Sequence, residues 1–280
     1  APEVFPLGET IVTWTATDII GNVSTLSQSI VLIDSTAPRI AFSEDLTIEA
    51  SSLDQNKIEL NRPEAADQVE IALITNDAPE VFPLGETIVT WTATDSSGNS
   101  ASATQTITII DTTLPSIIPP VDQQIEATSM TNNIIEYGFA EASDQVEIAS
   151  ITNDAPEVFP LGETIVTWTA TDSSGNSASA TQTITIIDTT LPSIIPPVDQ
   201  QIEATSMTNN IIEYGFAEAS DQVEIASITN DAPEVFPLGE TIVTWTATDN
   251  YNNSISNEQT ITIIDMTLPL IAAPSNLITE

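Results

Sequence analysis

The chain has 280 residues and a formal net charge of −38, because 41 Asp and Glu stand against three Lys and Arg. It lacks the clustered basic side chains that hold nucleic acid and other polyanions, so its expected partners are cations, above all divalent ones. It has no Cys and no His, which excludes disulfides, thiolate or imidazole zinc sites and catalytic triads with a His base.

A repeat of 77 residues organises the sequence. Residues 78–154 and 155–231 are identical letter for letter, and the four Trp residues recur at the same spacing. A period of this kind indicates a tandem array of modules. All apolar runs are far shorter than the roughly 18 residues of a membrane span, so we expect no direct membrane insertion in this segment. The Trp residues are Trp14, Trp91, Trp168 and Trp245.

Within one copy of the repeat, two long strands form the clearest pattern. In 164–172, Val166, Trp168 and Ala170 share one phase and Thr residues share the other, which is typical of a half-buried strand. The alternation resumes in 177–187 after the turn sequence Asp-Ser-Ser-Gly-Asn. These two strands are therefore predicted to form a hairpin.

Three further β-branched runs follow, bounded by Asn, Asp, Ser and Pro. No window has helical periodicity, so the predicted fold class is all-β. Six or seven short strands in each copy, with frequent turn signals, are typical of a small antiparallel sandwich. The further runs are 200–205, 210–217 and 223–229.

Each copy carries the same motifs in the same order. They are D-T-T-L-P at 111–115, I-E-A at 125–127, A-S-D at 142–144, F-P-L-G-E-T at 159–164, V-T-W-T-A-T-D at 166–172, S-G-N at 174–176 and a closing T-I-T-I-I-D. In this order they resemble the hyalin repeat, or HYR, module. The resemblance implies immunoglobulin-like sandwiches of an extracellular, cell-surface protein with a structural or adhesive role. The chain departs from many family members in having no Cys, so it lacks whatever disulfide support they have.

The D-T-T-L-P motif sets the expected module boundaries. If each module starts at the Asp of that motif, three full HYR-like modules occupy 34–110, 111–187 and 188–264. Residues 1–33 then correspond to the C-terminal part of a module, and 265–280 to the N-terminal strand of a further one. The linker is short and its Pro favours extended geometry in the preceding residue. We therefore expect tandem immunoglobulin-like antiparallel β-sandwiches that form an extended rod.

Carboxylates are expected to gather at each junction between modules. In an immunoglobulin-like module, the B–C and F–G loops lie at the end that faces the preceding module. Four acidic residues without a basic neighbour would then meet at each of three junctions, and calcium takes about six to eight oxygen ligands of this kind. The residues are Asp34, Glu64, Asp67 and Asp95; Asp111, Glu141, Asp144 and Asp172; and Asp188, Glu218, Asp221 and Asp249.

A plainer interpretation of these residues remains open. Asp before Ser-Ser-Gly or Thr-Thr is a typical turn residue, whose side chain bonds nearby backbone amides without any metal. Calcium at the junctions, and turn chemistry with diffuse counterions, are therefore both retained. Repulsion among so many uncompensated carboxylates shifts the balance toward bound cations.

The aromatic side chains are expected to serve the core. Trp168 lies in the inward phase of its strand, which favours a core role over a carbohydrate-stacking platform. Phe159, Tyr214 and Phe216 lie in strand or turn contexts that suit packing. Gln182 also falls in the inward phase and recurs every 77 residues, so we expect it to be hydrogen-bonded at the edge of the core.

These features predict a protein that is not an enzyme, because a small sandwich repeated in tandem leaves little volume for a catalytic cleft. The first hypothesis is the structural repeat region of an extracellular surface filament, stalk or sheath, with modules acting as cation-stiffened spacers. Copies of the chain or other surface proteins are the expected macromolecular partners. The alternative is an adhesin whose modules bind a glycan or a partner surface protein. Unpaired exposed aromatics would indicate the adhesin, whereas the outward positions are mostly Thr and Ser.

Overall fold

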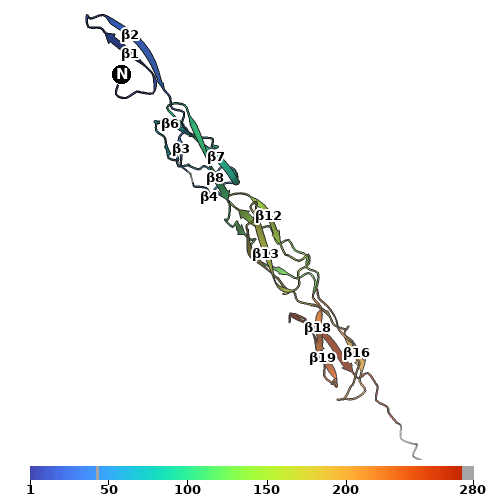
Figure 1. Ribbon diagram of the computed structural model, residues 1–280. Helices are drawn as coiled ribbons and strands as arrows, with labels where there is room; N and C mark the ends of the chain where they lie inside the picture. Colours follow the sequence, from blue (N-terminus) through green and yellow to red (C-terminus); the bar gives the residue numbers. More distant parts are fainter. Residues whose placement is uncertain (42–43, 273–280) are drawn as a thin grey trace, which may run out of the picture. The chain divides into compact units, whose positions relative to one another are not determined.

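The computed structural model describes residues 1–41 and 44–272, and in that part of the chain every regular element is a β-strand. Figure 1 shows the strands coloured in chain order. None of the described residues forms a helix that is long and apolar enough to cross a membrane. Of the expected strand in 265–280, residues 273–280 lie outside the described part, and 265–272 form no strand.

We call residues 34–110, 111–187 and 188–264 the first, second and third repeats. The chain divides into two compact units, and the boundary between them runs through the second repeat. One unit comprises Ala1–Ser116, Ala142–Ile151 and Ala170–Ala178. The first repeat therefore lies in this unit, together with the start of the second repeat and two of its loops. The third repeat lies in the other unit, with the rest of the second.

The first repeat is built from two sheets. The smaller sheet pairs β3 (Arg39–Ile40) with β5 (Ala65–Ala66), both short. In the larger sheet one pair is parallel and the others are antiparallel, so the expected antiparallel pairing holds with this one exception. The larger sheet has the order β4 (Leu46–Glu49), β8 (Ser100–Ile110), β7 (Gly85–Asp95), β6 (Ile71–Asn76), with β4 and β8 parallel.

The second and third repeats have the same strand order as the first. The second contains β9 (Ser116–Ile118), β10 (Gln123–Glu126), β11 (Glu141–Ser143), β12 (Ile148–Asn153), β13 (Gly162–Asp172) and β14 (Ser177–Ile187). The third contains β15 (Ser193–Ile195), β16 (Gln200–Glu203), β17 (Glu218–Ser220), β18 (Ile225–Asn230), β19 (Gly239–Asp249) and β20 (Ser254–Ile264). The chain thus consists of tandem all-β sandwiches.

The N-terminal hairpin pairs β1 (Gly8–Thr17) with β2 (Val23–Leu32). In the hairpin, no second sheet among the described residues covers the inner face, so Trp14 remains 59% exposed. Its indole nevertheless donates a hydrogen bond to Gln28 Oε1 at 3.2 Å. The alternation of apolar and polar residues is therefore sufficient for the hairpin to form, whereas burial of its Trp requires a second sheet.

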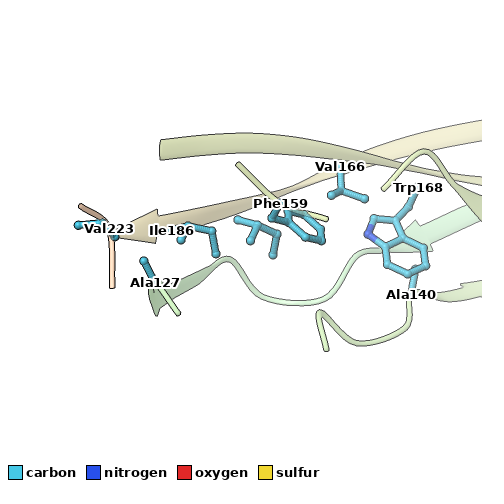
Figure 2. Close-up of a cluster of buried hydrophobic side chains, with 8 residues drawn as sticks. Ala127, Ala140, Phe159, Val166, Trp168, Ile186 and Val223 are labelled. Atoms are coloured by element: carbon cyan, nitrogen blue, oxygen red, sulfur yellow. The ribbon is translucent and has the colours of Figure 1, made fainter. Parts of the chain in front are cut away.

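The core of each full repeat is centred on its Trp, which confirms the core assignment. Trp91, Trp168 and Trp245 are each 3% exposed. Figure 2 shows the cluster of the second repeat, in which Trp168 lies toward Ala140. Removing such apolar surface from water stabilises the fold by about 25 cal/mol per Å², so the alternating Val, Trp and Ala residues are a main source of module stability.

A hydrogen-bonded Gln closes one side of this core, as its inward phase predicts. Gln182 Oε1 accepts a bond of 3.2 Å from Trp168 Nε1. Its Nε2 donates to the carbonyls of Val121 and Tyr137, each at 2.9 Å. Gln182 is fully buried, and a buried amide is tolerated when its donors and acceptor are paired. The amide thereby ties together three separate segments of the module.

The expected strand at 210–217 is the main error in the predicted elements. Asn210 forms only an isolated bridge, and regular pairing resumes at β17. Gly215, with φ +94°, interrupts the run and shifts its in-and-out alternation. Tyr214 and Ala217 therefore face inward while Phe216 is 91% exposed. The expectation that Phe216 packs is wrong.

Candidate metal centre

Three Asp residues from different segments meet at the start of each full repeat. In the first repeat, Asp34 follows β2, Asp67 follows β5, and Asp95 ends β7. One carboxylate oxygen of each lies within 4.8 Å of the other two. We call each such group an Asp triad. The other triads are Asp111, Asp144 and Asp172, and Asp188, Asp221 and Asp249.

Local turns fix the orientation of each triad residue. Asp95 Oδ1 accepts hydrogen bonds from the backbone N–H groups of Ser97 (2.8 Å) and Asn99 (2.9 Å). Asp67 Oδ1 accepts one bond, from Val69 N at 3.1 Å. These are the bonds that the turn interpretation predicts, but they use only Oδ1 of each carboxylate. The turns therefore hold the carboxylates in place and leave one oxygen of each for other partners.

An Asn side chain joins two carboxylates of each triad. Asn99 Nδ2 donates to Asp95 Oδ2 at 2.8 Å and to Asp34 Oδ2 at 3.1 Å. Asn176 and Asn253 make the same bonds in the other triads. The sequence reasoning did not find these residues, although the S-G-N motif contains the first two. The partly positive amide of the Asn offsets some of the repulsion between the two carboxylates.

Burial and hydrogen bonding act in opposite directions on the triad carboxylates. Burial alone would raise the pKa of Asp172, but the hydrogen bonds from Asn176 and from the backbone N–H groups of Ser174 and Gly175 together outweigh it and hold that pKa below its usual value. Asp95 and Asp249 show the same balance, with their pKa values lowered. For Asp188, burial raises the pKa, and repulsion from Asp221 adds to it. The third triad therefore contains a carboxylate whose ionisation is opposed first by burial and then by the neighbouring carboxylates.

The three Glu residues expected at the junctions do not belong to the triads. Glu64, Glu141 and Glu218 are all exposed. Glu218 lies in β17, opposite Ile195 of β15. In the other repeats, Glu141 is the first residue of β11, and Glu64 directly precedes β5. Three of the four acidic residues expected at each junction therefore come together, and the fourth, the Glu, is held in or beside the small sheet before the loop turns toward the triad.

A different Glu connects each repeat to the next. Glu49, at the end of β4, accepts bonds from Thr112 N (2.7 Å) and Thr113 Oγ1 (3.0 Å). The first of these bonds is the main reason that the pKa of Glu49 is lowered. Glu126 and Glu203 bind the equivalent linker residues. Sequence reasoning assigned no role to this Glu, although it is the central residue of the I-E-A motif.

The loop that supplies the second triad Asp also packs against the preceding repeat. Val146 donates its backbone N–H to Asp144 Oδ1 at 3.0 Å, and its side chain packs in the core cluster of the first repeat. Val223 is fully buried in the cluster of the second repeat, where it lies toward Ala127 (Figure 2). One short loop thus provides both a carboxylate and an apolar contact between repeats.

The triads have the chemistry of a hard-cation site. Carboxylate oxygens bind calcium and magnesium, and both ions complete their shells with carbonyls and water. The three carboxylates are oriented by turns before any ion binds, which reduces the ordering that binding would require. Asp34, Asp67 and Asp95 fit this role, and so do the equivalent residues of the other two triads.

The solved structures that the chain matches include tandem cadherin domains. Extracellular cadherin domains 1–4 of protocadherin gamma B7 have a TM-score of 0.35 and 14% identity, covering 91% of this chain and 83% of that one. Domains EC22–24 of mouse cadherin-23 have a TM-score of 0.30 and 13% identity, covering 82% of this chain and 99% of that one.

Curated relatives are similar over nearly all of the chain. Hyalin from Strongylocentrotus purpuratus is 37% identical over 304 residues, which is 99% of this chain and 25% of that protein. Hyalin from Lytechinus variegatus is 34% identical, covering 99% of this chain and 56% of that protein. The chain therefore spans a quarter and just over half of the lengths of these relatives. The HYR domain family matches residues 33–109 and 110–186, more than half of the sequence. This chain belongs to the HYR domain family.

Proposed function

We propose that this chain is a non-catalytic spacer region of an extracellular surface filament, stalk or sheath, with divalent cations bound at the Asp triads. The triads carry the proposal. The same three carboxylates recur at the start of all three full repeats, each within 4.8 Å of the others. Similarity to hyalin supports an extracellular location.

Electrostatics supports an ion at each triad. Three carboxylates at this separation repel one another, and the Asn amide has too few N–H groups to pair with all of their oxygens. In the described residues, Oδ2 of Asp67 accepts no hydrogen bond. The net charge of −38 adds a long-range field that concentrates cations near the chain. A bound divalent ion would remove the local repulsion.

Calcium is the ion that the site favours. Its shell of about six to eight oxygens at about 2.3–2.6 Å is variable, whereas magnesium demands near-ideal octahedral geometry. Each triad draws its ligands from a linker and two loops, with carboxylate oxygens up to 4.8 Å apart. A site assembled in this way adapts more readily to the larger and more variable shell.

The contacts around each triad support a spacer role. The linker residue Thr112 donates a hydrogen bond to Glu49 of the preceding repeat. Val146, in a loop of the following repeat, packs in the core of the preceding one. Asp111 of the linker belongs to a triad. An ion there would connect the linker to two loops of the following repeat. Because 78–154 and 155–231 are identical, successive junctions would be stiffened in the same way, as a spacer of uniform pitch requires.

Calorimetric titration of the full chain with calcium tests this function. The key variant is Asp67→Asn/Asp144→Asn/Asp221→Asn, because Asn keeps the Oδ1 acceptor of each turn and removes only the charge. We expect three equivalents of calcium per wild-type chain and loss of these sites in the variant.

The matched control removes three other Asp charges. Asp77, Asp154 and Asp231 each accept a backbone hydrogen bond outside the triads. Replacing all three with Asn changes the net charge by the same amount, and calcium binding should be retained. Absence of binding to the wild type at millimolar calcium, or equal loss in the control, would contradict the assignment to the triads.

A further inference from the structure

A groove on the third repeat lies beside its core and has no role in the cation sites. Its volume is about 390 Å³, within the range of about 300–1,000 Å³ that is usual for small-molecule sites. It lies between the end of the β18–β19 pair and the irregular segment that precedes β17. The lining residues that bear on its chemistry are Glu213, Tyr214, Phe216, Asn230 and Trp245.

The floor of the groove is a fixed pair of aromatic rings. The rings of Tyr214 and Trp245 are tilted by 54°, with centroids 5.9 Å apart. Tyr214 also packs against Phe236 at 5.7 Å, and Trp245 Nε1 is bonded to Gln259 Oε1. Contacts on several sides therefore set the position of both rings before any ligand binds.

The rim of the groove carries an aromatic side chain that the core does not need. Phe216 is 91% exposed, and Phe139 is 91% exposed at the same position of the second repeat. Gly215, with φ +94°, turns the Phe outward, and a Cβ added there would lie 3.0 Å from Pro197. An exposed Phe beside a groove supplies a ring face for stacking.

Oriented polar groups complete the groove. Asn230 Oδ1 accepts bonds from Tyr214 O–H (3.3 Å) and Ala232 N (3.1 Å). These bonds fix the amide, and its Nδ2 donates to no group in the described part of the chain. The exposed carboxylate of Glu213 supplies an acceptor. A ligand thus meets the exposed ring of Phe216, a free donor and a free acceptor in one place.

We propose that this groove, and the same residues in the second repeat, bind a neutral saccharide. A pyranose ring offers an apolar C–H face to an aromatic ring and hydroxyl groups to an amide and a carboxylate. The charge of −38 and Glu213 at the rim disfavour acidic sugars. This role goes beyond that of a spacer and does not depend on cations at the triads.

The first repeat provides a natural internal control. Leu60, Asn61 and Arg62 stand where the third repeat has Tyr214, Gly215 and Phe216. It therefore lacks the floor Tyr and the rim Phe, although Trp91 and Asn76 are present. The proposal predicts two saccharide sites per chain, one in the second repeat and one in the third.

The test titrates the full chain with neutral oligosaccharides of glucose, galactose, mannose, fucose and N-acetylglucosamine. Tryptophan fluorescence and saturation-transfer NMR report binding. We expect at least one of these sugars to bind two sites per chain, and Phe139→Ala/Phe216→Ala to weaken its Kd at least about tenfold. Because both Phe are exposed, the melting temperature of the variant should not change.

The matched control is Ile134→Ala/Ile211→Ala, which removes exposed apolar side chains outside the groove lining. It should bind like the wild type. Failure of every sugar to bind, or unchanged binding by the Phe variant, would overturn the proposal. Self-association of the chain that is lost with the two Phe, without sugar binding, would also overturn it and identify a second copy as the occupant.

Discussion

Asn176 donates a hydrogen bond of 3.1 Å from its side-chain amide to Oδ2 of Asp111, 65 residues earlier in the chain. The same amide donates to Asp172 Oδ2 at 2.9 Å. A neutral side chain thus holds together two carboxylates that would otherwise repel. This bond connects the start of the second repeat to its last hairpin without any ion.

The first prediction concerns this amide. Asn176→Asp replaces the donor with a fourth carboxylate, so repulsion in the triad increases and a potential ligand is added. In chelator, the variant should melt a few degrees below the wild type. In calcium, it should recover most of that loss and bind calcium more tightly. A lower melting temperature that calcium does not restore would show that the triad holds no ion.

The second prediction tests the Trp and Gln pair of the core. Trp168→Ala should destabilise its module by about 3–5 kcal/mol, because Trp168 is 3% exposed. Gln182→Ala should cost about 1–3 kcal/mol, since it leaves the Trp indole and two carbonyls without their partner. Chemical denaturation measures both. A cost near zero for either variant would contradict the role of that side chain in the core.

The third prediction concerns acid. Hydrogen bonds, first from Thr189 N and then from the Thr190 hydroxyl, lower the pKa of Glu126 from its ordinary value of 4.5. A lowered folded-state pKa contributes stability that is present above the unfolded-state pKa and is lost as pH falls through the folded-state value. Glu126→Gln should therefore melt below the wild type at pH 7, and the difference should shrink below about pH 4.5.

The control for acid is Glu157→Gln, because Glu157 accepts no hydrogen bond from a side chain or linker in the described residues. The difference between this variant and the wild type should stay small across the same pH range. A pH-independent difference for Glu126→Gln would show that the linker does not depend on the ionised carboxylate.

The fourth prediction is that the modules line up end to end as an extended rod, as the short linkers indicate. Strands of this length rise about 3.3 Å per residue, so each module should advance the rod by roughly 30–40 Å. Small-angle X-ray scattering of the full chain in calcium should give the distance distribution of a rod. Scattering typical of a compact globule would contradict it.

Sequence patterns predicted the regular parts of the fold well. The alternation around Val166 and Trp168 identified a buried strand and its core side chain, because period 2 is a direct consequence of the pleat. The pattern failed around Phe216, where the positive φ of Gly215 shifts the alternation by one residue. In a sequence, a positive φ is indicated only by the presence of a Gly. The sequence does not indicate which neighbouring side chain that Gly turns outward.

The candidate site was predicted in part. Loop order in an immunoglobulin-like module was sufficient to bring Asp111, Asp144 and Asp172 together, but it could not separate them from Glu141, which the sheet retains. The bridging role of Asn176 was missed because an Asn next to a Gly is typical of a turn and does not by itself indicate a contact with a distant carboxylate. Glu126 was missed because its partner lies 63 residues away, a separation that one sequence does not reveal.

The central claim is that the Asp triads hold divalent cations that stabilise the repeats. Thermal unfolding of the full chain in calcium and in chelator tests it most directly. An ion that binds only the folded state adds about 2.7 kcal/mol when it is present at about 100 times its Kd. We predict a higher melting temperature in calcium for the wild type, and no such difference for Asp67→Asn/Asp144→Asn/Asp221→Asn. Equal melting temperatures of the wild type in millimolar calcium and in chelator would contradict the claim and leave the triads as turns held by Asn99, Asn176 and Asn253.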